Sequence, residues 1–189
     1  MTYSGRKIAI VYSTVDGQTL KICHVIASLL NKNNLQTKLY PIDSFQEDPL
    51  SFDTMVIGAS IRYGKHNTLI SNFILNNRDK LSRIKTAFFS VNLVARKKDK
   101  GQPDSNPYLI RFLNRVAWKP DLSEVFAGKL DYPSYSFIDR VMIQLIMKLT
   151  GGPVRSEKPI EYTDWKRVEE FGWKICKIND LPDPAGQSL

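Results

Sequence analysis

Two hydrophobic periodicities alternate along the 189-residue chain. Short runs of apolar and β-branched residues predict buried strands, and longer segments with apolar residues three and four positions apart predict helices. The predicted strands are 7–13, 36–42, 54–60, 86–94 and 124–130. The predicted helices are 19–33, 68–81, 106–118 and 164–178. Strands that alternate with helices in this way predict an α/β fold, in which a parallel sheet is covered by helices on both faces.

The pattern fits a single domain over residues 1–180, with five parallel strands in the doubly wound order 2-1-3-4-5. Sheets of this kind bind ligands beyond the carboxyl ends of their strands, at the switch point between strands 1 and 3. A ligand site is therefore expected at the loops 13–19, 60–66 and 90–98. The tail 181–189 contains two prolines and small polar residues, and we expect it to fray.

An inserted segment, about 131–163, separates the last predicted strand from the last predicted helix. Within it, residues 137–149 include nine apolar residues of thirteen, and Ser136 with Asp139 resembles a capping box. One apolar stripe is formed by Phe137, Ile138, Val141, Met142, Leu145 and Leu149. The segment is too short to span a membrane. Three interpretations stay open: an oligomer interface or core contact, a wall of a hydrophobic substrate site, and a peripheral contact with an anionic membrane.

The first of the three loops is rich in hydroxyl groups. Its residues are Ser13, Thr14, Val15, Asp16, Gly17, Gln18 and Thr19. Free backbone N–H groups and the helix dipole converge where a strand leads into a helix, so the loop is suited to an anion. It lacks the lysine of a P-loop and the pattern G-x-G-x-x-G, which favours a monophosphate over a nucleoside triphosphate. Helix capping by Thr14 or Asp16 accounts for the same residues.

The other two loops add a ring, a cation and hydrogen-bonding groups. The second loop is Ser60, Ile61, Arg62, Tyr63 and Gly64, and the third is Ser90, Val91, Asn92, Leu93 and Val94. A flat heteroaromatic ligand could stack on Tyr63. Two cysteines, Cys23 and Cys176, form no metal-like spacing, and no secretory signal precedes the first strand. We therefore expect no metal, no disulfide and a reducing, cytoplasmic environment.

The charge balance favours an anionic partner. The chain has a net charge of +8 at pH 7, which suits an acidic ligand, an anionic membrane surface or nucleic acid. Base-stacking modules are missing, so we expect no nucleic-acid partner. Arg96, Lys97 and Lys98 directly follow the third loop. Their position makes them candidates, together with Arg140, for binding the carboxylates of a substrate.

Five segments, in unchanged order and spanning nearly the whole chain, carry a more specific resemblance. They are YSTVDGQT (12–19), VIGASIRYGK (56–65), FSVNLVARK (89–97), DRVMIQLIMKLTGG (139–152) and YTDW (162–165). With them the chain resembles the flavodoxin-fold family and, within it, the bacterial FMN-dependent, quinone-coupled protoporphyrinogen IX dehydrogenases. The resemblance implies FMN as cofactor, with its phosphate at 13–19 and its ring between 60–64 and 90–94.

The resemblance also implies an activity: oxidation of protoporphyrinogen IX to protoporphyrin IX in heme biosynthesis, with ubiquinone or menaquinone as acceptor. It implies a cytoplasmic protein peripheral to the inner membrane, with Arg62 stabilising negative charge on reduced FMN. Two departures from simple flavodoxins stand out. Asp16 stands beside the predicted phosphate, and the third loop lacks an aromatic lid, which leaves one flavin face open. The alternatives are a flavodoxin-like electron carrier, which the basic net charge disfavours, an NAD(P)H:quinone reductase, and a non-catalytic scaffold.

Overall fold

The computed structural model describes residues 5–149 and 151–179. Its main sheet contains the parallel strands β1 (Lys7–Ser13), β2 (Gln36–Pro41), β3 (Thr54–Arg62), β5 (Lys85–Val91) and β6 (Leu122–Phe126). Their spatial order is β2-β1-β3-β5-β6, which confirms the predicted order 2-1-3-4-5. A short strand, β4 (Lys65–His66), pairs with β3 in the antiparallel direction. The predicted frayed tail, 181–189, lies outside the described residues.

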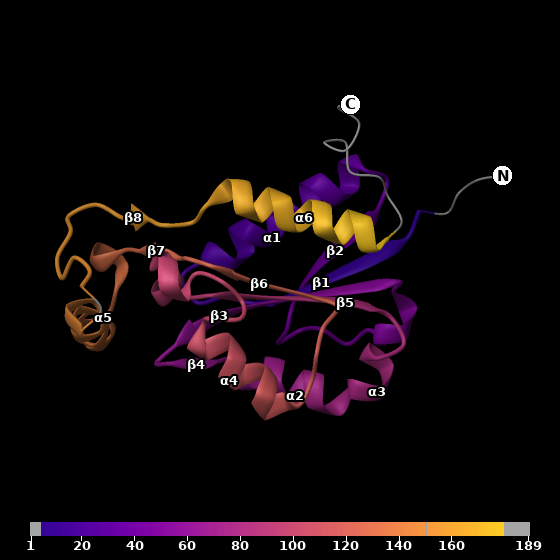
Figure 1. The fold of residues 1–189 in the computed structure, drawn as a ribbon, viewed down its shortest axis with the longest axis horizontal. Coiled ribbons are helices and arrows are strands. Elements are labelled where there is room, and N and C mark those ends of the chain that lie inside the picture. Colours follow the sequence, from indigo (N-terminus) through magenta and orange to yellow (C-terminus); the bar gives the residue numbers. More distant parts are fainter. Residues whose placement is uncertain (1–4, 150, 180–189) are drawn as a thin grey trace.

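Helices cover both faces of the sheet, as Figure 1 shows. One face packs against α1 (Gln18–Lys32) and α6 (Trp165–Ile178). The other packs against α2 (Thr68–Asn76), α3 (Arg78–Leu81) and α4 (Pro107–Val116). The first and last helices lie side by side although the chain between them builds most of the sheet.

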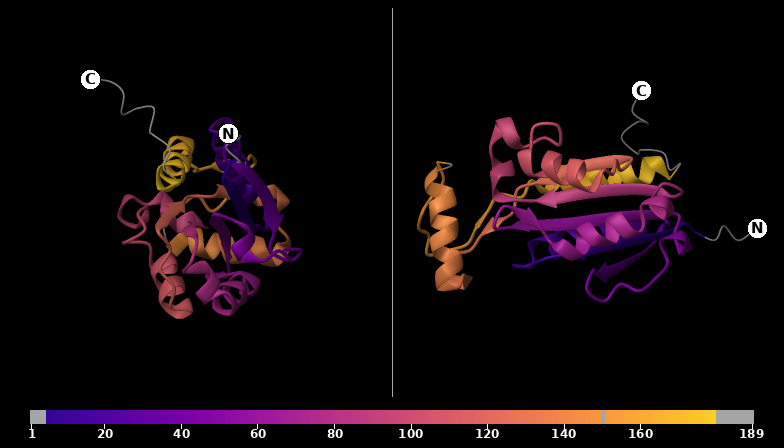
Figure 2. Two further views of the ribbon diagram at one scale, coloured as in Figure 1. Left: turned by 90° about the vertical axis from the view of Figure 1, so that its right-hand side faces the viewer. Right: turned by 90° about the horizontal axis from the view of Figure 1, so that it is seen from below.

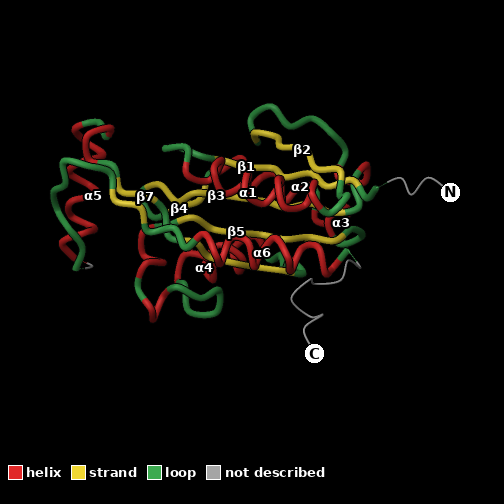
Figure 3. The backbone as a smooth tube through the Cα atoms, turned by 90° about the horizontal axis from the view of Figure 1, so that it is seen from above, coloured by secondary structure: helices red, strands yellow, loops and turns green. Residues whose placement is uncertain are grey.

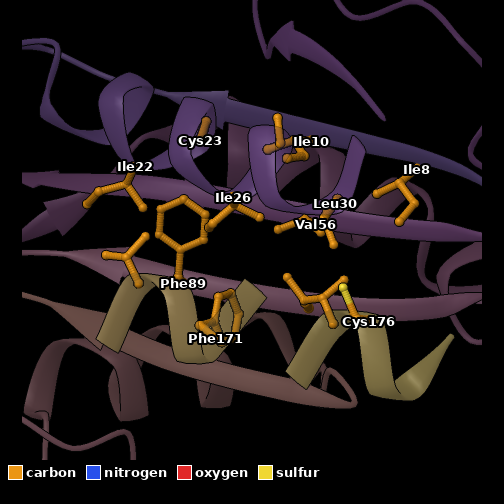
Figure 4. Packing of buried hydrophobic residues seen from close by; sticks show 14 of the residues in the cluster. Ile8, Ile10, Ile22, Cys23, Ile26, Leu30, Val56, Phe89, Phe171 and Cys176 are labelled. Atoms are coloured by element: carbon orange, nitrogen blue, oxygen red, sulfur yellow. The ribbon is translucent and has the colours of Figure 1, made fainter. Parts of the chain in front are cut away.

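The sheet is buried on both faces because its strands are apolar at consecutive positions. In β1, Ile8 and Ile10 belong to the core cluster under α1 and α6, whereas Ala9 and Val11 belong to the cluster on the opposite face. Figure 4 shows the first cluster, in which the ring of Phe89 lies among side chains of the sheet and of α1. Consecutive apolar residues are the pattern expected of a parallel strand between two helical layers.

Three predicted elements are shortened or divided in the structure. The helix predicted over 68–81 is two helices, because Asn77 ends α2 and its side chain donates to the carbonyl of Phe73 at 2.9 Å. The strand predicted over 86–94 ends at Val91, because the side chain of Asn92 accepts from the N–H of Ala95 and begins a 3-10 turn. The strand predicted over 124–130 is divided into β6 and β7 (Lys129–Leu130). Short 3-10 turns occupy η1 (Pro49–Ser51), η2 (Leu93–Arg96), η3 (Lys98–Lys100) and η4 (Tyr132–Ser134).

The inserted segment forms a separate layer at the carboxyl ends of the strands. Its two ends pair as β7 and β8 (Ile160–Glu161), and between them lies α5 (Phe137–Leu149), with the bounds that the sequence predicts. Figures 2 and 3 show α5 running across the strand ends rather than along them. Among the described residues, no helix has the length and apolar character that crossing a bilayer requires.

Packing inside the insertion distinguishes one face of α5 from the other. Met147 is fully buried against Leu130, Tyr132 and Tyr135. The predicted cap at Ser136 is also present, since its hydroxyl accepts from the N–H of residue 139 at 3.3 Å. The predicted apolar stripe, by contrast, faces outward: Phe137 is 80% exposed and Leu149 is 77% exposed.

Gly58 of β3 and Phe89 of β5 lie in close contact, and this contact offers a test of the sheet packing. Gly58 pairs with Phe89 across the two strands, and a Cβ atom at position 58 would overlap the Phe89 ring. We expect Gly58→Ala to lower the free energy of unfolding by about 1–3 kcal/mol, because the buried ring cannot move aside without strain. Urea denaturation measures the change. In the background Phe89→Leu the same substitution should cost much less, and equal costs in both backgrounds would contradict this packing.

Candidate flavin site

The loop between β1 and α1 leaves the start of the helix open to a ligand. Gly17 occupies the N-cap position with φ of 77°, and no side chain caps the first turn of α1. The interpretation in which Thr14 or Asp16 caps this helix is therefore wrong. The left-handed conformation at residue 17 favours glycine. Since the first N–H groups of a helix have no partner within the helix, α1 presents unpaired donors at the carboxyl end of β1.

Side chains of the same loop are buried without hydrogen-bond partners. The buried atoms without a partner are Ser13 Oγ, Thr14 Oγ1, Gln18 Oε1 and Thr19 Oγ1. Thr19 is only 1% exposed, so bulk solvent scarcely reaches its side chain. Buried hydroxyls without partners are costly and rare. Three hydroxyl donors beside an uncapped helix N-terminus fit an anion such as a phosphate group.

The carboxylate of Asp16 does not oppose an anion at this loop. Its Oδ2 lies 3.1 Å from Nη1 of Arg62, which stands at the end of β3. The guanidinium also pairs through Nη2 with the carboxylate of Asp139 in α5. Asp16 is therefore turned toward the second loop, where it shares the Arg62 guanidinium with Asp139.

The second loop is a tight hairpin that the sequence analysis did not predict. Tyr63 and Gly64 both have positive φ, of 50° and 74°, and they join Arg62 to its partner Lys65. Two consecutive left-handed residues form the type I′ turn that matches the twist of paired strands. A tyrosine in this conformation is strained. The turn is held in place because the Tyr63 hydroxyl donates to Asp139.

The carboxylate of Asp139 is well stabilised in its charged form. It accepts hydrogen bonds from the hydroxyls of Tyr63 and Ser136, the latter at 2.7 Å. These two bonds, together with the Arg62 guanidinium, hold the pKa of the Asp139 carboxyl below its ordinary value. Asp139 is therefore ionised at neutral pH.

The third loop is fixed by a buried polar network. Nε2 of His66 lies 2.8 Å from Oγ of Ser90, and Asn92 donates to the same oxygen at 3.3 Å. Burial, with a smaller effect of the Arg115 charge, lowers the pKa of His66 to about 3. The imidazole is therefore neutral at physiological pH, and it fixes the third loop through its hydrogen bond with Ser90.

One cavity joins the three loops to the inserted helix. The sequence-predicted residues that line it are Thr14, Asp16, Gln18, Thr19, Ser60, Ile61, Arg62, Tyr63, Gly64, Val91, Asn92, Leu93 and Val94. Ser13, Val15, Gly17 and Ser90 do not line this cavity. Ser13 and Val15 line an adjoining hollow, while Gly17 shapes the helix start and Ser90 binds His66.

The cavity also has walls that sequence reasoning missed. These residues are Tyr108, Gly128, Lys129, Tyr135, Asp139, Met142, Ile143 and Ile146. Four of them come from α5. The one acidic residue in a helix with nine apolar positions was the available signal for Asp139, which was considered only as part of a helix cap. The apolar residues of α5 were covered by the interpretation of this helix as a wall of a hydrophobic substrate site. Tyr108, Gly128, Lys129 and Tyr135 gave no local signal.

The basic candidates for substrate binding lie outside this cavity. Nη1 of Arg96 donates to the carbonyl of Leu93 at 2.8 Å, and its guanidinium lies 6.0 Å from the centre of the Tyr162 ring. Arg140 lines a different hollow, together with Gln144 of α5 and Arg155. Lys97 and Lys98 belong to neither hollow. Binding of substrate carboxylates by these four residues stays a prediction.

Comparison with known proteins agrees with this architecture. A family model described as a flavodoxin domain matches residues 9–157. Protoporphyrinogen IX dehydrogenase (quinone) of Escherichia coli K12 is 41% identical over 93% of this chain and 98% of its own. This chain belongs to the protoporphyrinogen IX dehydrogenase (quinone) family. It is therefore a flavodoxin-domain protein within a family of oxidoreductases.

Two further comparisons extend the result. The protoporphyrinogen IX dehydrogenase (quinone) of Leishmania major is 42% identical over 90% of this chain and 75% of its own. The crystal structure of oxidised flavodoxin 1 from Bacillus cereus covers 90% of this chain and 97% of its own, with a TM-score of 0.52 and 16% identity. The dehydrogenase family thus keeps the flavodoxin fold. In this chain α5 lies over the edge of the sheet where the cavity is found.

Two buried threonines give a matched test of the anion site. The hydroxyl of Thr19 has no partner, whereas that of Thr54 donates to Asn179 at 2.8 Å. We expect Thr19→Val to leave the free energy of unfolding of the ligand-free protein unchanged or to raise it by about 1 kcal/mol, since no bond is lost. Thr54→Val should lower it by about 1–3 kcal/mol, because it leaves the Asn179 acceptor unpaired.

The same variants separate stability from binding. Inorganic phosphate should raise the melting temperature of the wild type and of Thr54→Val, and it should raise that of Thr19→Val much less. Calorimetry in phosphate-free buffer, with and without added phosphate, measures both effects. A stability loss in Thr19→Val as large as in Thr54→Val would show that the Thr19 hydroxyl has a partner within the protein.

Proposed function

We propose that this protein binds FMN and oxidises protoporphyrinogen IX to protoporphyrin IX, with a quinone as electron acceptor. The substrate loses six electrons and six protons. Three quinone molecules each take up two electrons and two protons and become quinols. The named activity of relatives that are 41% and 42% identical supports the proposal. The observation that carries it is the set of unpaired hydroxyls beside the uncapped start of α1.

The residues present fit the cofactor in both of its parts. Thr14, Thr19 and the first N–H groups of α1 would hold the phosphate, and Ser13 would add a further hydroxyl from the end of β1. The ring system would occupy the cavity between the loops 60–64 and 91–94. When bound, FMN supplies two-electron redox chemistry, and the protein contributes binding, orientation and electrostatics.

The walls of the cavity favour a flat, apolar reactant. Met142, Ile143 and Ile146 line it from α5, opposite the polar loops. An apolar wall excludes water and accepts the face of a tetrapyrrole or a quinone. Met142 also reaches the surface, where it is 36% exposed. The cavity therefore borders the exposed stripe of α5, and a poorly soluble reactant could enter from that side.

The test is a spectroscopic titration of the purified protein. Reconstituted with FMN, it should be yellow, and anaerobic protoporphyrinogen IX should bleach the flavin absorbance. A quinone should then restore it, with three quinones consumed per porphyrin formed. A protein that does not bind FMN would contradict the proposal. Rapid bleaching by NADPH but not by porphyrinogen would instead favour an NAD(P)H:quinone reductase.

We further propose that the outer face of α5 docks on an anionic membrane, from which the quinone is taken. The exposed stripe comprises Phe137, Ile138, Val141, Met142, Leu145 and Leu149. The basic residues Arg140, Lys148, Arg155 and Lys158 lie on α5 and in the segment after it, and all are exposed. Apolar residues accompanied by arginine and lysine suit the headgroup region of a bilayer. A second copy of this chain would bring the same positive charges together, which disfavours a dimer through this face.

With this assignment, the protein would lie at the cytoplasmic face of the inner membrane. Its reaction would belong to heme biosynthesis. Vesicle co-sedimentation tests the docking surface. Wild type should bind vesicles that contain phosphatidylglycerol more strongly than vesicles of phosphatidylcholine alone. Ile138→Ser combined with Leu145→Ser should reduce binding about tenfold or more, since about 25 cal/mol is lost per Å² of apolar surface no longer buried.

A matched control uses exposed apolar residues far from α5. Leu69 and Leu75, both in α2, are 46% and 45% exposed. The double variant Leu69→Ser and Leu75→Ser should bind vesicles like the wild type. Equal losses in the two double variants, or a wild type that sediments as a dimer dissociated by the α5 substitutions, would contradict membrane docking through this helix.

A further inference from the structure

Four charged side chains line the cavity within the described residues. They are Asp16, Arg62, Lys129 and Asp139. The ammonium group of Lys129 is paired with Asp131 at 2.7 Å. The remaining three form one cluster in which a single guanidinium lies between two carboxylates. The cluster therefore carries one net negative charge.

The cluster links three separate parts of the fold. Asp16 belongs to the loop before α1, Arg62 ends β3, and Asp139 belongs to the inserted helix. The side chain of Asp139 is 14% exposed, less than the 24% of Arg62 and the 35% of Asp16. Interactions between charges are screened least where water is excluded, so Asp139 is placed to act strongly on its neighbours.

Two aromatic side chains complete the surroundings of Arg62. Its Cζ atom lies 5.7 Å from the centre of the Tyr63 ring and 6.0 Å from that of Tyr135. The Tyr63 hydroxyl donates a hydrogen bond to Asp139. The guanidinium is thus fixed in position by contacts on several sides. Removing the Asp139 charge would leave Arg62 paired with Asp16 alone.

A flavin gains negative charge when it is reduced at neutral pH. An unopposed arginine in the cavity would favour the reduced form, and a further carboxylate would disfavour it. The resemblance to the dehydrogenases implies that Arg62 stabilises this charge. In the structure, however, two carboxylates share the guanidinium, so its charge is more than balanced within the cluster.

We propose that Asp139 is a positioning residue for the flavin site: it fixes Arg62, offsets its charge and thereby lowers the reduction potential of the bound flavin. This inference rests on the proposed function, since it requires FMN in the cavity. It assigns to the inserted helix a second role besides that of a cavity wall. Through Asp139, α5 makes the reduced cofactor a stronger electron donor to the quinone.

The test compares isosteric and charge-conserving variants. Asp139→Asn should favour the reduced flavin by about tenfold, which is about 30 mV toward positive potential for a two-electron couple. Asp139→Glu keeps the charge and should restore a potential near that of the wild type. Equilibration of the FMN-loaded protein with a reference dye under anaerobic conditions measures the potential.

Two further variants make the result specific. Asp16→Asn removes the other carboxylate without touching α5, and it should shift the potential in the same direction. Asp48→Asn removes an exposed carboxylate paired with Lys80 at 3.1 Å, outside the cavity, and should leave the potential unchanged. Asp16→Asn keeps the contacts of α5. It can therefore still report the effect of removing a carboxylate on the flavin potential if Asp139→Asn folds poorly.

Four outcomes decide whether the proposal holds. Shifts in Asp139→Asn and Asp16→Asn, with none in Asp139→Glu and Asp48→Asn, would support the proposal. Equal potentials in wild type and Asp139→Asn, both loaded with FMN, would overturn it while leaving FMN binding intact. A shift of the same size in Asp139→Glu would show that Asp139 acts only by anchoring the helix. A wild type that takes up no FMN would refute the proposed function itself.

Discussion

The unsatisfied donors at the start of α1 are the constraint on which the rest of this site depends. Hydroxyls of the first loop are buried without partners, and no side chain caps the helix. A folded chain tolerates such groups where a ligand supplies the missing acceptors. Asp16, which would repel an anion, is held away by Arg62. These groups therefore suit an anion, and they lie beside the cavity that the three loops line.

The inserted helix gives this flavodoxin fold its particular character. One side of α5 packs on the β7–β8 hairpin, a second lines the cavity, and a third faces outward with an apolar surface. Asp139 joins the cavity side to Arg62 and Tyr63. A single helix therefore closes the cavity, contributes to its electrostatics and exposes an apolar surface.

Long periodic segments were predictable from the sequence, and the contacts between them were not. The five strands and their order follow from apolar runs separated by helices, and α5 has the predicted bounds. Its orientation could not be predicted, because a helix with nine apolar residues of thirteen does not indicate which side is buried. Strands of two residues, such as β4 and β7, are too short to produce a pattern. The role of Asp139 depends on contacts with residues more than 70 positions earlier, which no local pattern reveals.

The affinity of the ligand-free protein for FMN relative to riboflavin tests the central claim most directly. The two molecules share the ring and differ only in the phosphate group. Since each hydrogen bond to a charged group is worth about 1.5–3 kcal/mol, the account predicts that FMN binds about 100-fold more tightly or better. It also predicts that Thr19→Val reduces this preference. Equal affinities for FMN and riboflavin would contradict the assignment of the first loop as a phosphate site.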